Sequence, residues 1–152
     1  MKLRRFALVG TALLLSWSRV AAAQSISVSP ASVGTLRITA AVAGQEPTAV
    51  VLSGGHYTLR MKKNQGIRTI TARLNAPLPA GTTLTITLAS PGGTAQSAGP
   101  VALSTSARDV VTNIPNSNKN YSAATISYRI EATTDAGVIA SRSVSVMLTL
   151  DN

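Results

Sequence analysis

The sequence predicts an all-β protein built from antiparallel sheets. In seven segments apolar residues alternate with polar ones, which places the apolar side chains on one face of an extended strand. Turns containing Gly, Pro or Asn separate these segments, and no stretch after residue 24 has a convincing helical pattern. Strands with one apolar face are typical of antiparallel sheets that cover a core. We therefore expect a sandwich of about seven to nine strands.

The expected strands follow one another with short connections. Asn64, Gln65 and Gly66 fit a tight hairpin turn, and Asp135 to Gly137 predict a final hairpin. Residues 95–103 predict a weak edge strand, because Pro100 has no N–H to donate to a ladder. Residues 107–114 fit a short strand or a helical turn equally well. The seven alternating segments are residues 26–28, 36–42, 57–61, 70–74, 84–88, 126–132 and 144–150.

The N-terminus has the three parts of a signal peptide in the right order. Lys2, Arg4 and Arg5 form a positive region, residues 6–15 are apolar, and Ala21 to Ala23 supply the small residues of a cleavage site. The apolar run is too short for a spanning helix, which needs roughly 20 residues. We therefore expect residues 1–23 to be removed and residues 24–152 to form one exported domain without a membrane span. Its destination is the periplasm, the cell surface or the medium.

The exported part is large enough to fold around its own core. Its length falls within the usual range of one domain. The chain has no cysteine, so neither a disulfide nor a lipid anchor on cysteine is available. Packing and sheet hydrogen bonds must therefore hold the fold together.

The positive charge of the chain decreases when the signal peptide is removed. The whole chain has a formal charge of +9, and loss of Lys2, Arg4, Arg5 and Arg19 leaves +5. The basic residues that fall close together are Arg60, Lys62, Lys63 and Arg68. They either contact an anionic polysaccharide or surface polymer, or form the solvated side of a sheet. Nucleic acid is not an expected partner, because Tyr57, Tyr121 and Tyr128 are the only aromatic residues after residue 23.

The chain offers little for catalysis or metal binding. His56 is the only histidine, and no G-x-S-x-G motif accompanies it. One histidine and no cysteine argue against zinc, and the five acids are scattered singly, which argues against calcium. Glu131 shares the outer face of its strand with Arg129, which predicts a surface ion pair. We expect no enzyme activity, no cofactor and no metal.

The pattern resembles the secreted immunoglobulin-like and pilin-like β-sandwich modules of bacteria. Residues 25–42 and residues 125–150 carry this resemblance. It implies a structural or adhesive module that pairs with itself or with other envelope proteins by strand addition. The chain departs from many such subunits in having no disulfide and no aromatic residue near its end. Met147, expected on the outward face of the last strand, is a further candidate contact.

Overall fold

A computed structural model describes residues 24–31, 36–38, 45–62, 66–115, 118–137, 139 and 142–151. These residues form an all-β structure of two antiparallel sheets, which confirms the expected fold class at that level. The described residues contain no α-helix and one short 3-10 turn, η1 (Thr134–Ala136). The predicted signal peptide, Lys63 and residues 39–42 of the second alternating segment lie outside the described residues.

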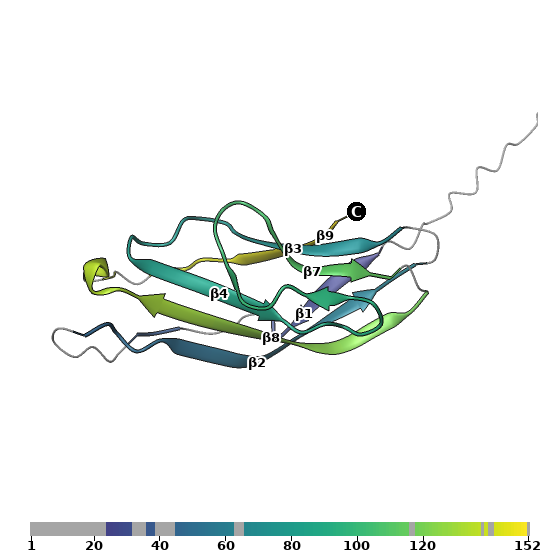
Figure 1. The fold of residues 1–152 in the computed structure, drawn as a ribbon, viewed down its shortest axis with the longest axis horizontal. Helices are drawn as coiled ribbons and strands as arrows, with labels where there is room; N and C mark the ends of the chain where they lie inside the picture. The colour runs from purple at the N-terminus through teal and green to yellow at the C-terminus, as the bar shows by residue number, and fades with distance from the viewer. Residues whose placement is uncertain are drawn as a thin grey trace, which may run out of the picture.

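The described residues form nine strands in the two sheets, and Figure 1 shows β3, β7 and β9 in one layer above β2 and β8 in the other. The first sheet has the order β1-β2-β8-β4-β6, and the second has the order β5-β7-β3-β9. The strands are β1 (Ser25–Ser29), β2 (Val50–Arg60), β3 (Arg68–Leu74), β4 (Thr82–Leu88), β5 (Gln96–Ser97), β6 (Val101–Ala102), β7 (Arg108–Ile114), β8 (Asn120–Ala132) and β9 (Val146–Asp151).

The alternation of the sequence sets which side chains enter the core. On β4, Leu84, Ile86 and Leu88 are buried, and the threonines between them lie on the other face. Residues 107–114, whose sequence fits either a short strand or a helical turn, contribute the strand β7. Its neighbouring residues Val110 and Val111 are both buried, because the pairing with β3 shifts register there.

Both expected hairpins are wrong. β2 lies in the first sheet and β3 in the second, so the turn at residues 64–66 does not join paired strands. The same holds for β8 and β9, which flank η1. Turn residues such as Gly66, which has a φ of +80°, show where a chain changes direction. They do not show whether the chain returns beside the same strand or crosses to the other sheet.

The expected edge strand at residues 95–103 is present as two pieces. β5 and β6 are each two residues long and form one outer edge of each sheet, with Pro100 between them. A serine hydroxyl and a backbone amide hold this corner to the core strands: Ser97 Oγ donates to the Leu88 carbonyl, and Leu103 N–H donates to the Leu84 carbonyl over 2.8 Å.

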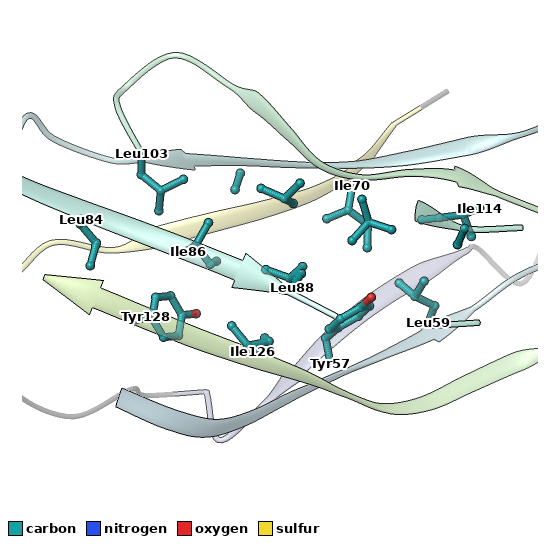
Figure 2. Packing of buried hydrophobic residues seen from close by; sticks show 14 of the residues in the cluster. Tyr57, Leu59, Ile70, Leu84, Ile86, Leu88, Leu103, Ile114, Ile126 and Tyr128 are labelled. Atoms are coloured by element: carbon teal, nitrogen blue, oxygen red, sulfur yellow. The ribbon is translucent and has the colours of Figure 1, made fainter. Parts of the chain in front are cut away.

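Apolar side chains from both sheets meet in one core, as Figure 2 shows for Tyr57, Ile126 and Tyr128 below Ile70 and Leu103. The Tyr57 hydroxyl lies inside this core and donates a hydrogen bond to the Ala89 carbonyl. Since no disulfide is available, burial of these side chains and the backbone ladders supply the stability.

Candidate functional site

One side of the molecule is open between the edges of the two sheets. β1 is the outer strand of the first sheet and β9 the outer strand of the second, and they lie close together without pairing. Among the described residues, each therefore has one edge without a ladder partner. An unpaired edge of this kind exposes N–H and C=O groups that a further strand can bind.

The two edges on the open side differ from those on the opposite side. β5 and β6 have two residues each, a length that offers little to a further strand, whereas β1 has five residues and β9 has six. β9 pairs with β3 in continuous register over six residues, without a bulge. Neither β1 nor β9 contains Lys, Arg or Pro, the residues that commonly protect edges. These features make β9 a regular and accessible edge.

A groove of about 870 Å³ runs along the open side. β1 contributes Ile26 and Val28 to its walls, and the second sheet contributes Val146 and Leu148 of β9. Arg37 and Arg142 are its charged residues, and both are exposed. No acidic residue is among the described residues that line the groove.

The core is less completely covered along this groove than on the opposite side. Ile26, Val28, Ile130, Val146 and Leu148 pack against the core but remain partly exposed. In contrast, Ile86, Leu88, Val110 and Val111 are each 0% exposed. Because burying apolar surface is favourable, a strand that filled the groove with apolar side chains would gain stability there.

A smaller hollow of about 160 Å³ adjoins the groove and shares Val28 and Tyr128 with it. It lies where β2 loses its regular register with β8, between Ser53 and Gly55. Gly54 has a φ of +110° at this point, and the Ser29–Pro30 peptide bond beside it is cis.

The structure brings three basic residues to one end of the molecule. Arg60 ends β2, Lys62 follows it, and the Met61 N–H donates to the Lys119 carbonyl over 3.0 Å. Arg68 begins β3 in the other sheet and is half-buried, so it is less exposed than Arg60. Lys119 is the member that sequence reasoning missed, because its distance along the chain hides its position beside β2.

His56 lies on the exposed face of the first sheet, opposite Ser29 and Thr125. A catalytic Ser-His-Asp arrangement would need a carboxylate beside His56. Asp109, however, belongs to β7 in the other sheet, and Asp135 lies in η1. Neither carboxylate is therefore on the strands that flank His56. The predicted surface ion pair is confirmed, since Arg129 Nη2 lies 2.6 Å from Glu131 Oε1.

Two of the tyrosines belong to the core. Burial raises the pKa of the Tyr57 phenol, and burial also raises that of Tyr128. Both therefore remain neutral at physiological pH. Tyr57 is 1% exposed and Tyr128 is 5% exposed, so neither offers an open aromatic platform.

The described residues contain no group of three His, Cys, Asp or Glu side chains placed to hold a metal ion. Within the same part of the chain, no helix is long and apolar enough to span a membrane. Met147 is 42% exposed on β9, as expected from its place in the alternation. No family model matches the chain, and neither a curated protein nor a solved structure matches it.

Proposed function

We propose that this chain is an exported, non-enzymatic structural or adhesive module that joins another envelope chain by strand addition. Its open side, between β1 and β9, is the site of that addition. An added strand would gain backbone hydrogen bonds from the edge and specificity from alternate side chains in the groove. The observation that carries this proposal is the combination of a regular β9 edge, which contains no Lys, Arg or Pro, with an adjoining groove lined mostly by apolar residues.

The strand order of the described residues supports an immunoglobulin-like sandwich. Immunoglobulin constant-type domains have the sheets A-B-E-D and C-F-G. The order β1-β2-β8-β4 fits A-B-E-D, and the pair β3-β9 fits C-F, in agreement with chain order. β5, β6 and β7 are then an insertion between D and E. The position of strand G lies beside β9, where the described residues supply no strand.

The test of this proposal is the assembly state of the exported protein. Size-exclusion chromatography and electron microscopy of material released from the cell surface should show the chain joined to copies of itself or to another envelope protein. Leu148→Lys places a charge in the groove and should release the chain from that assembly. Thr83→Lys, at an exposed position of β4 that does not line the groove, is the matched control and should leave it intact. A strict monomer in both cell extracts and purified form would contradict the proposal.

A second candidate function rests on the basic end of the molecule. Arg60, Lys62 and Lys119 lie together there and suit an anionic envelope polysaccharide. Salt-sensitive binding to an immobilised anionic polysaccharide should weaken when these residues and Lys63 are replaced by Gln. Binding that is unchanged in this variant would remove the candidate.

A further inference from the structure

The charges on the groove restrict which strand it accepts. Arg37 and Arg142 are exposed on its walls, and no acidic side chain is among its described lining residues. Alternate apolar side chains of an added strand fit beside Val28, Val146 and Leu148. Acidic residues next to that apolar stretch would be attracted to the two arginines, and basic residues there would be repelled.

A second copy of this chain is unsuited to supply the added strand, because its acidic residues do not lie on a segment that could enter the groove. Asp109 and Glu131 lie on β7 and β8, each of which is paired on both edges. Asp135 lies in the 3-10 turn η1, and Asp151, on β9 itself, accepts a hydrogen bond from Thr71 Oγ1 over 2.6 Å.

Two segments near the start of the domain are also unsuited to serve as the added strand. Glu46 is followed by Pro47, which cannot donate to a ladder. β1, the edge strand of the first sheet, has the sequence SISVS and contains no acid. In addition, two copies with a net charge of +5 in the expected exported form repel each other.

We therefore propose that the groove beside β9 accepts an extended segment of a different protein, in which alternating apolar residues are flanked by acidic ones. This inference rests on the proposed strand addition and names the partner class. The backbone of the segment pairs with the free edge of β9, its apolar side chains complete the core, and its carboxylates pair with Arg37 and Arg142.

Two synthetic peptides of equal length test the charge rule. Both contain the same central run of alternating Val and Thr, and they differ only in having two Glu or two Lys at each end. Fluorescence anisotropy with the exported form of the chain should show that the Glu peptide binds about tenfold more tightly at low ionic strength. High salt should reduce this difference, because exposed charges are screened. A third peptide with Pro at its centre should not bind, since it lacks an N–H for the ladder.

Charge reversal in the groove is the sharper test. The double variant Arg37→Glu with Arg142→Glu should prefer the Lys peptide. The control variant Arg73→Glu with Arg108→Glu has the same net charge, but its substituted residues are exposed on β3 and β7 and do not line the groove. It should keep the preference for the Glu peptide.

The outcomes separate this inference from the proposed function. Equal binding of the Glu and Lys peptides would overturn the charge rule. Self-assembly abolished by Leu148→Lys would overturn the choice of a different protein while supporting strand addition. Failure of both peptides to bind a chain that is a strict monomer would overturn both.

Discussion

The Tyr57 hydroxyl links β2 to the end of β4 inside the core, through its hydrogen bond to the Ala89 carbonyl. Because burial raises its pKa above the ordinary value of about 10, its ionisation disfavours the folded state. The stability that it contributes is therefore complete below about pH 10 and decreases as the pH rises further.

Tyr57→Phe should lower the free energy of unfolding by about 1 kcal/mol at neutral pH, because the Ala89 carbonyl loses its donor. The same variant should lose less stability than the native chain between about pH 9 and pH 11. Urea unfolding at several pH values measures both effects. An alkaline decrease as steep as that of the native chain would exclude Tyr57 as its source.

Substitution of Gly81 and of Gly99 by Ala separates two losses of stability: the steric clash of an added Cβ and the unfavourable positive φ. Their φ values are nearly equal, +72° and +73°, but a Cβ on Gly81 would lie 2.8 Å from the backbone of Ala136, whereas Gly99 has open space. Gly99→Ala should cost about 1 kcal/mol for the unfavourable φ alone. Gly81→Ala should cost about 1–3 kcal/mol more, because η1 must move. Equal losses in thermal unfolding would show that η1 does not pack against Gly81.

The strands themselves show how unevenly the core is covered. Ile86 on β4 is fully buried, whereas Ile130 on β8 lines the groove and is partly exposed. Ile86→Ala should therefore cost about 2–5 kcal/mol, and the same substitution at Ile130 should cost about half as much in the isolated chain. Denaturant unfolding of the two variants makes the comparison. Equal losses would mean that the groove is covered as fully as the opposite side.

The same strands show which features of the fold can be predicted from the sequence. Alternation located β3 and β4 correctly, because burial of one face leaves a direct mark on residue order. It could not reveal which strands pair, so both expected hairpins were wrong. The groove could not be predicted either, since Arg37 and Val146 come to line the same groove only after the chain has crossed between the sheets. The position of Lys119 at the basic end could not be predicted for the same reason, because it depends on which strands pair.

At the scale of the whole molecule, the proposed export predicts which form of the chain carries out the function. Mass spectrometry of protein recovered from the periplasm or the medium should give an N-terminus at Gln24. This form would lack the four basic residues of the predicted signal peptide, which would lower the formal charge from +9 to +5. A recovered chain that keeps Lys2 to Ala23 would show that the N-terminal segment is retained.

Amide hydrogen exchange along β9 tests the central claim, that this edge is free to accept a strand. In an antiparallel edge strand only alternate N–H groups bond to the neighbouring strand, so the isolated exported chain should show protected and fast-exchanging amides in alternation from Val146 to Asp151. Addition of the Glu peptide should protect the fast ones. Uniform protection along β9 in the isolated chain would show that the edge is already covered and would contradict the account.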